Sequence, residues 1–446
     1  MTTTLKYDEI SALAAPLEQA LVPFMRRFPG NAGERQPVHT VYGGAHLFRA
    51  DTAPKLGETA ARFLDEYGVD AFTFADAVGL PTAHAETIWE RVREKLLVEP
   101  VEDFRIDFED GYGNRPDEEE DAHAAAVGRE LAQGLQDGTL PPFIGIRVKP
   151  FTQELMRRGI RTLDIVLTTL LKQADGVLPP NFVVTLPKIQ LPEQVSLLCD
   201  VFDELEPRLR LDKGSLKLEF MIETTQSILS EKGESNLPRF LDAARGRAVA
   251  AHFGTYDYTA SCNITAAEQR MDHPSCDFAR QMMQIAYAGT GLWLSDGATN
   301  IMPVPPHRGA SLAPDQLEEN RTTVHRAWRL HAAHIRHSLV HAYYQGWDLH
   351  PAQLPTRFAA VYSFFLSGLA PATERLRNFM EKAGQATLVG DVFDDAATGQ
   401  GLLNYFIRGI NSGALTEEEA LATGLTLDEL RTRSFVRILA GRRLAL

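Results

Sequence analysis

Short apolar runs recur between residues 41 and 294, and they are typical of β-strands buried on both faces. Many of their side chains are β-branched or aromatic, which favours strands over helices. We expect strands at Val41–Leu47, Phe104–Phe108, Phe143–Val148, Phe182–Leu186, Leu216–Ile222, Ala248–Phe253 and Leu292–Leu294. A weaker eighth candidate is Ala71–Phe74.

Amphipathic stretches of helical period lie between several of these runs, at Asp117–Gln136, Ile160–Ala174 and Pro192–Glu206. The first begins with four acidic residues and the last has proline in its first turn, and both features favour a helix N-terminus. Strands that alternate with helices at this spacing predict a parallel sheet, closed or open.

The pattern changes after about Pro303. The segment 303–309, PVPPHRG, is typical of a linker, and only helical patterns follow it. We expect helices at Asp315–Gln345, Pro355–Lys382, Gly401–Asn411, Glu417–Thr423 and Leu427–Leu439. The chain is therefore expected to divide into residues 1–305, which hold the sheet, and a C-terminal all-helical domain, residues 306–446.

Composition narrows the class of protein. The 446 residues include 45 Lys and Arg against 59 Asp and Glu, a net charge of −14. Such an acidic chain argues against nucleic-acid binding and against a polybasic membrane anchor. We expect no signal peptide, because no apolar segment follows a basic start in residues 1–10, and no membrane span, because no run reaches about 18 apolar residues. The three cysteines fit neither a disulfide framework nor a zinc site. We expect a soluble, cytoplasmic protein that acts on small molecules.

Ionisable residues follow five consecutive strands. In a barrel, the carboxyl ends of the strands converge on one mouth, where barrel enzymes place their active sites. Charges next to buried strand residues must pair, bind a metal or bind a substrate. The residues in question are Glu109 and Asp110, Arg147, Lys188, Glu223 and Asp257. A ring of salt bridges that closes the barrel is the structural alternative.

Glu223 and Asp257 are the candidate metal ligands. Two carboxylates from neighbouring strands, with positions left open for water and substrate oxygens, suit Mg²⁺, and Mn²⁺ is the second choice. No His or Cys pair accompanies them, which argues against zinc. Backbone N–H groups of the turn at Gly254 and Thr255 could hold a substrate carboxylate. Taken alone, Asp257 could instead be a helix N-cap.

Arg147 is the candidate for stabilising negative charge in a transition state, because a guanidinium is a fixed cation with forked donors. Its structural alternative is an ion pair with Glu109 or Asp110. For Lys188 the structural and functional interpretations stay equally open. The histidines at His334, His337 and His341 have a spacing that could support metal binding, but a solvated helix face explains them better.

The order of these motifs resembles the malate synthase and citrate lyase β-subunit superfamily, which includes malyl-CoA lyases, and malate synthase most closely. Phe108–Asp110, Ile146–Val148, Leu186–Lys188, Met221–Thr224 and Phe253–Tyr258 come in that order. Beyond the strands, Gly346–Pro351 and Phe393–Thr398 resemble two further segments of the family. The chain departs from malate synthases at Asp394, where they commonly have Glu, and at Thr255–Tyr256, where they commonly have Arg-Trp.

The resemblance implies a (β/α)₈ TIM barrel with a C-terminal helical domain that carries a general base at Asp395. It implies Mg²⁺-dependent Claisen condensation of acetyl-CoA, or a related acyl-CoA, with glyoxylate or a related 2-oxo acid. Arg147 would stabilise the enolate oxygen, and Gly254, Thr255 and Tyr256 would contact the substrate. Glu109, Asp110 and Lys188 would not bind the ion directly but would orient its ligands and the water molecules bound to it.

Three alternatives remain at this point. The first is a lyase that cleaves a malyl-CoA-like thioester or a 4-hydroxy-2-oxo acid with the same metal site. The second is a non-catalytic paralogue, which the presence of both Glu223 and Asp257 disfavours. The third is a phosphoenolpyruvate-dependent phosphotransferase, for which no phosphorylatable histidine stands out. Assembly into a homo-oligomer is compatible with the sequence.

Overall fold

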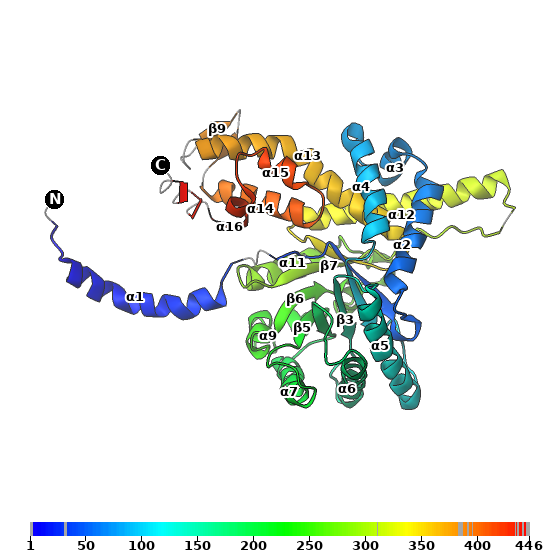
Figure 1. The fold of residues 1–446 in the computed structure, drawn as a ribbon, viewed down its shortest axis with the longest axis horizontal. Helices are drawn as coiled ribbons and strands as arrows, with labels where there is room; N and C mark the ends of the chain where they lie inside the picture. Colours follow the sequence, from blue (N-terminus) through cyan, green and yellow to red (C-terminus); the bar gives the residue numbers. More distant parts are fainter. Residues whose placement is uncertain are drawn as a thin grey trace.

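The structure is a computed structural model, and it describes residues 3–30, 34–309, 311–381, 387–389, 392–394, 396–432, 434, 437–438 and 441–442. Figure 1 shows two halves: a barrel ringed by helices below, and a group of long helices above. A separate helix, α1 (Tyr7–Arg27), projects from the side of the body.

Eight parallel strands form a closed barrel in the order β1 to β8. They are β1 (His39–Gly44), β2 (Asp103–Asp107), β3 (Phe143–Arg147), β4 (Phe182–Leu186), β5 (Lys217–Ile222), β6 (Ala248–Phe253), β7 (Trp293–Ala298) and β8 (Gln345–Asp348). The fold class expected from the sequence is confirmed, and seven strands lie where the apolar runs predicted them. Apolar runs suit these strands because outer helices and the barrel interior bury both faces.

The eighth strand is not where the sequence suggested. Ala71–Phe74 begins a helix, α3 (Ala71–Val78), which Asp70 caps by accepting hydrogen bonds from the N–H groups of Phe72 and Thr73. The barrel is closed instead by β8, which pairs with β1 on one side and β7 on the other. Since β8 lies beyond residue 305, the barrel draws its last strand from the part of the chain that was expected to be entirely helical.

Helices surround the barrel in the order that the alternation predicted. The helices of the barrel half are α5 (Asp117–Asp137), α6 (Met156–Gln173), α7 (Pro192–Arg208), α8 (Thr225–Ile228), α9 (Leu237–Ala243), α10 (Thr255–Ser261) and α11 (Pro274–Tyr287). Two ends have the expected local causes. Helix α7 starts at a proline, and α5 ends at Gly138, whose φ of +67° is a left-handed conformation that favours glycine.

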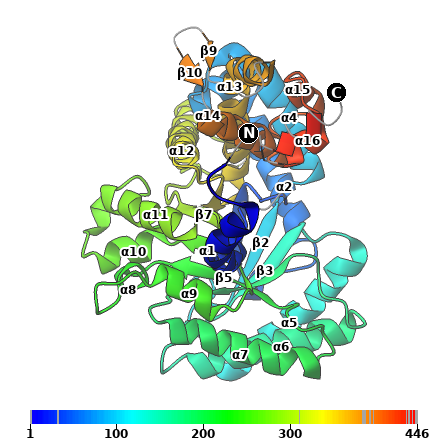
Figure 2. The ribbon, with the colours of Figure 1, turned by 90° about the vertical axis from the view of Figure 1, so that its left-hand side faces the viewer.

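The upper half is built from both sides of the sequence (Figure 2). Helix α3, with α2 (Thr52–Phe63) and α4 (Ala85–Val98), comes from between β1 and β2. Helices α3 and α4 pack against α12 (Pro314–Val340) and α13 (Leu354–Glu381). Smaller elements complete this half: β9 (Thr387–Val389), β10 (Val392–Asp394), α14 (Ala396–Asn411), α15 (Glu417–Leu421) and α16 (Leu427–Thr432).

The barrel interior is unusually polar. Arg105 donates two hydrogen bonds to Glu219, at 2.7 and 2.8 Å, and it also pairs with Asp103. His252 Nε2 lies 3.0 Å from the same Glu219. All four side chains are almost fully buried. Buried charges are stable only when they are paired, so this network fixes how the strands of the barrel sit against one another.

Asp348 at the end of β8 ties the barrel to the upper half. It accepts a hydrogen bond of 2.8 Å from Arg357 of α13, and its Oδ1 lies 3.0 Å from His331 Nε2 of α12. Burial alone would raise the pKa of Asp348, but the Arg357 guanidinium and His331 hold it well below its usual range. Gly346 leaves room for the Arg357 guanidinium beside Asp348, because a Cβ at residue 346 would lie 2.8 Å from that guanidinium.

No helix in the described part of the chain is long and apolar enough to cross a membrane.

Candidate active site

The predicted acidic residues do gather at the carboxyl-terminal mouth of the barrel. Glu223 directly follows β5 and is 1% exposed, whereas Asp257 lies in the first turn of α10, after β6, with a side chain that is 40% exposed. Glu109, just beyond β2, is also buried. Three carboxylates from three strand ends therefore face one small region, as the sequence predicted.

The electrostatics of Glu223 show how close these groups are. Burial raises its pKa to about 8, and the neighbouring carboxylates of Asp257 and Glu109 contribute to the rise. Its Oε1 accepts a hydrogen bond of 2.7 Å from the backbone N–H of Lys188. Lys188 adopts a φ of +51°, which is rare outside glycine, and this conformation turns its N–H toward Glu223. The site thus crowds negative charge and calls for a cation.

The Lys188 side chain supplies part of that positive charge. Its Nζ pairs with Glu109, lies 3.1 Å from Asp110 Oδ2 and lies 3.6 Å from Asp257 Oδ2. Burial would lower the pKa of Lys188, but Glu109 and Glu223 raise it above its ordinary value. Lys188 is therefore a charged ammonium in the middle of the acidic cluster.

Arg147, the last residue of β3, is held in one orientation. Its Nε and Nη2 donate to the two carboxylate oxygens of Asp107 at 2.7 and 2.6 Å. Its guanidinium lies over the rings of Tyr42 and Trp347, 4.9 and 5.4 Å from their centres. Its main partner is thus Asp107, which the sequence did not suggest, and the expected ion pair with Glu109 is also formed. Nη1 lies 3.1 Å from Glu109 Oε2, yet neither atom has a hydrogen-bond partner among the described residues.

Asp107 was missed by the sequence analysis, which treated it as part of a buried apolar strand. It is 1% exposed, and besides Arg147 it binds the backbone N–H groups of Glu109 and Gly111. The signal was present in the sequence, because Asp103, Arg105 and Asp107 alternate along β2. Alternate positions of a barrel strand point inward, so that pattern indicates a charged interior.

Gly254, Thr255 and Tyr256 lie beside the acidic cluster, where β6 passes into α10. A Cβ at Gly254 would lie 2.5 Å from Glu223 Oε2, so only glycine lets the chain pass this close to the carboxylate. Thr255 is buried, and its hydroxyl has no partner among the described residues. The Tyr256 hydroxyl donates to the Ala298 carbonyl and accepts from the Asn300 N–H, so it anchors the end of β7.

The residues at the mouth fit a divalent cation of the magnesium class. Carboxylate oxygens are the ligands such an ion prefers, and no histidine takes part in the described cluster. Burial and the carboxylates of Asp257 and Glu109 raise the pKa of Glu223, and a bound cation would relieve that crowding of negative charge. Glu223 and Asp257 would hold the ion, and Lys188 would shift toward Glu109 and Asp110.

Asp395, expected to be the general base, lies outside the described residues. The described part of α14 next to it packs on α13. Near its other end, Arg408 donates to Gln36 at 2.6 Å. Gln36 precedes β1, so the last turns of α14 lie at the end of the barrel where the strands begin. A cavity of about 350 Å³ also opens at that end, lined by residues such as Asp103, Lys217 and Trp293.

Known proteins resemble this chain mainly in fold. A family profile described as a domain of unknown function, DUF6986, matches residues 17–438. No curated protein matches the sequence. A citrate lyase from Burkholderia xenovorans LB400 superposes with a TM-score of 0.56 at 16% identity, covering 88% of this chain and 97% of the other.

Two further solved structures resemble the chain less closely. The CitE protein of Mycobacterium tuberculosis, in complex with magnesium, acetoacetate and coenzyme A, has a TM-score of 0.48 at 14% identity, with 85% and 99% coverage. A magnesium and glyoxylate complex of Haloferax volcanii malate synthase has a TM-score of 0.44 at 14% identity, with 89% and 97% coverage. The fold expected from the motif order is the fold of the citrate lyase.

Proposed function

The chain belongs to the DUF6986 family, and we propose that it is a Mg²⁺-dependent enzyme that makes or breaks a carbon–carbon bond next to a coenzyme A thioester. The proposal rests on the buried Glu223, whose pKa is raised by burial and by the carboxylates of Asp257 and Glu109 even though Arg147 and Lys188 lie nearby. A carbon–carbon lyase reaction, as the name of the superposed citrate lyase indicates, is compatible with such a site.

We propose condensation of acetyl-CoA, or a related acyl-CoA, with glyoxylate or a related 2-oxo acid. When bound, the ion would polarise the carbonyl group of the 2-oxo acid. Asp395 would accept the α-proton of the thioester, and Arg147 Nη1 would donate to the enolate oxygen that develops. The α-carbon then attacks the aldehyde carbon, and hydrolysis of the thioester by water releases free coenzyme A and a hydroxy acid.

The remaining residues of the mouth would position these groups. Asp107 and the rings of Tyr42 and Trp347 keep the Arg147 guanidinium from rotating. The N–H groups of Nη1, which have no hydrogen-bond partner among the described residues, therefore keep a fixed direction. Lys188, drawn toward Glu109 and Asp110, would leave Asp257 free to bind the ion. Thr255 offers an unpaired hydroxyl to the substrate, next to the close approach of Gly254 to Glu223.

A lyase is the second candidate, because the same residues catalyse the reverse reaction when hydrolysis is absent. The chain superposes on a citrate lyase, which supports a lyase as the second candidate. An assay with Mg²⁺, glyoxylate and a panel of acyl-CoAs separates the two. A synthase gives free coenzyme A and a hydroxy acid in equal amounts, whereas a lyase gives a hydroxyacyl-CoA that it also cleaves. No Mg²⁺-dependent product with any acyl-CoA would reject both.

A further inference from the structure

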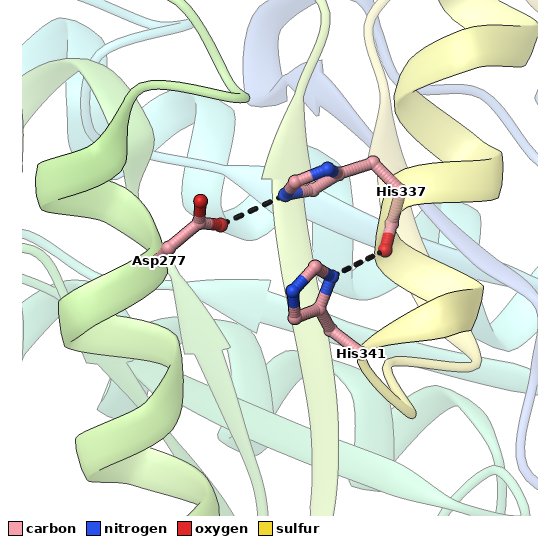
Figure 3. Close-up of side chains that lie close together, drawn as sticks. All are labelled: Asp277, His337 and His341. Atoms are coloured by element: carbon pink, nitrogen blue, oxygen red, sulfur yellow. Dashed lines mark hydrogen bonds and ion pairs between the residues drawn. The ribbon is translucent and has the colours of Figure 1, made fainter.

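We propose a second metal site, remote from the barrel mouth, that binds a borderline transition-metal ion such as Zn²⁺ between α11 and α12. Asp277 lies on α11, His337 lies in the last turn of α12, and His341 caps that helix. One ligand atom from each lies within 4.8 Å of the others. Figure 3 shows the three side chains converging on the space between the two helices.

The two histidines are arranged as ligands. Residues at i and i+4 lie on one face of a helix, a spacing that lets two imidazoles reach one ion. Their ring centres are 4.4 Å apart. His341 Nδ1 lies 2.8 Å from the His337 carbonyl, and only a protonated Nδ1 can donate to it (Figure 3). That bond leaves the lone pair of Nε2 free, as in many metal-bound histidines.

The carboxylate is positioned by its own neighbours. Arg280 Nη2 donates to Asp277 Oδ1 at 2.6 Å, and His337 Nε2 lies 2.8 Å from the same oxygen. Asp277 Oδ2 has no hydrogen bond from any residue that the structure describes. The positive charge of Arg280 is shared with Asp296, 2.9 Å from its Nη1, and with the Met271 carbonyl. An ion would bind Oδ2 together with His337 Nε2, which lies 2.8 Å from Asp277 Oδ1 and 3.3 Å from Arg280 Nη2.

The donor set selects the kind of metal. Two imidazole nitrogens and one carboxylate oxygen suit Zn²⁺, whereas Mg²⁺ prefers oxygen ligands alone. The side chains of Asp277 and His337 are 28% and 27% exposed, so an ion can enter from solvent. Because it would join α11 to the end of α12, its role is a structural clip between the barrel and the upper half.

The test is a titration of the full-length Glu223→Gln variant with ZnCl₂, so that the mouth of the barrel does not contribute. We expect one ion per chain and a rise in Tm. Adding His341→Ala or Asp277→Asn should weaken binding by at least tenfold and remove the Tm shift, whereas His84→Ala, outside the cluster, should change neither. Unchanged zinc affinity after the addition of His341→Ala or Asp277→Asn, or no saturable zinc binding to the Glu223→Gln protein itself, would overturn the proposal. Tm without metal shows that each variant is folded.

A second inference rests on α1, and we infer that it pairs with the same helix of a second copy of this chain. No residue of α1 is buried. Its C-terminal end is anchored to the body: Arg27 pairs with Asp242, and Gly30 N–H donates to the Gly289 carbonyl at 2.8 Å. A helix with internal prolines at Pro16 and Pro23 has little stability alone, so it needs a partner surface.

The apolar stripe of α1 matches itself. At 100° per residue, Tyr7, Val22 and Met25 lie to one side of a narrow stripe of five large exposed apolar residues, at 10, 13, 17, 21 and 24. Their spacings of three, four, four and three read the same in both directions, with Leu17 at the centre. Two antiparallel copies therefore interdigitate around a two-fold axis at Leu17.

The geometry leaves room for both bodies. Helix α1 projects away from the body and is about 31 Å long, so antiparallel pairing puts the two bodies at opposite ends (Figure 1). Two helices of this length bury on the order of 1,200 Å² together, the lower end of stable specific interfaces. The association should therefore depend on protein concentration.

Analytical ultracentrifugation of the full chain tests the pairing. We expect the wild-type protein to sediment as a dimer at micromolar concentration. The double variant Leu13→Glu with Leu17→Glu should sediment as a monomer, whereas Ser11→Glu with Gln19→Glu, which adds the same charge off the stripe, should remain a dimer. A monomeric wild type, or equal masses for both variants, would contradict the pairing.

Discussion

At the scale of single residues, the mouth of the barrel is a set of charges that constrain one another. Sequence reasoning found Glu223, Asp257, Arg147 and Lys188 because each follows an apolar run. It did not find Asp107, because a charged residue inside an apolar run has no evident role in the sequence. Its role becomes clear only when the structure shows that the barrel interior is polar. It also could not foresee that Lys188 would pair with Glu109, because that contact joins different strands.

Arg147→Lys tests the role of the fixed guanidinium. A lysine ammonium carries its three N–H groups on one nitrogen, so it cannot reproduce the planar fork that binds Asp107 with two nitrogens and presents a third. The kcat of the condensation should therefore fall roughly 10²- to 10³-fold. Mg²⁺ affinity should change little, because Arg147 is not a ligand. Steady-state kinetics beside a Mg²⁺ titration measure both, with the exposed Arg321→Lys as control. Unchanged kcat would remove Arg147 from the reaction.

His334 gives a prediction for pH. The sequence favoured a solvated face for the histidines of α12, but His331 and His334 are buried. Burial lowers the pKa of His334 to about 4, below the ordinary value near 6.5. The unfolded chain therefore binds a proton at this position between pH 6.5 and 4 that the folded protein does not. The free energy of unfolding contributed by His334 should fall as pH drops through that range.

Urea denaturation at pH 7, 6 and 5 measures this effect. One proton changes the slope by about 1.4 kcal/mol per pH unit. The difference in unfolding free energy between the wild type and His334→Gln should therefore become less favourable to the wild type as pH falls. Parallel pH profiles for the two proteins would show that His334 does not titrate in this way.

At the scale of elements, periodicity predicted seven strands and failed for the eighth. Ala71–Phe74 is apolar and short, but Asp70 caps it as a helix. The true β8 has only four residues, Gln-Gly-Trp-Asp, and no apolar pattern. Its position is set by long-range contacts, chiefly those of Asp348 with Arg357 and His331, which no local pattern reveals.

Asp348→Ala should therefore destabilise the whole protein, not only β8. Removing one partner of a buried ion pair leaves Arg357 uncompensated, and such losses are about 3–5 kcal/mol of unfolding free energy. Chemical denaturation measures the change, and Asp76→Ala, at an exposed position of α3, serves as the control. A loss no larger than in the control would mean that Asp348 does not join the barrel to α12 and α13.

At the scale of the whole molecule, the barrel and the upper half share one core, since β8 lies between α12 and α13 in the chain. The proposed reaction needs both: carboxylates at the mouth and a base on the segment between β10 and α14. The sequence motif predicts that base at Asp395, and the described residues do not test it.

Asp395→Asn isolates this base. It should abolish exchange of the α-protons of acetyl-CoA with deuterated solvent while leaving Mg²⁺ and glyoxylate binding nearly intact, because only the proton acceptor is lost. Asp394→Asn, one residue away, is the matched control and should keep most of the exchange. Full exchange in Asp395→Asn would assign the base to another residue, and equal loss of binding and exchange would indicate a folding role.

Calorimetric titration with Mg²⁺ measures directly whether Glu223 helps to hold a divalent cation. Since its carboxyl has a pKa of about 8, binding at pH 7 should release close to one proton, measured as a dependence of the heat on the buffer. Glu223→Gln should bind Mg²⁺ at least tenfold more weakly and release no proton, while the exposed Glu231→Gln should match the wild type. Equal Mg²⁺ affinity and proton release in Glu223→Gln and the wild type would show that Glu223 does not bind the ion.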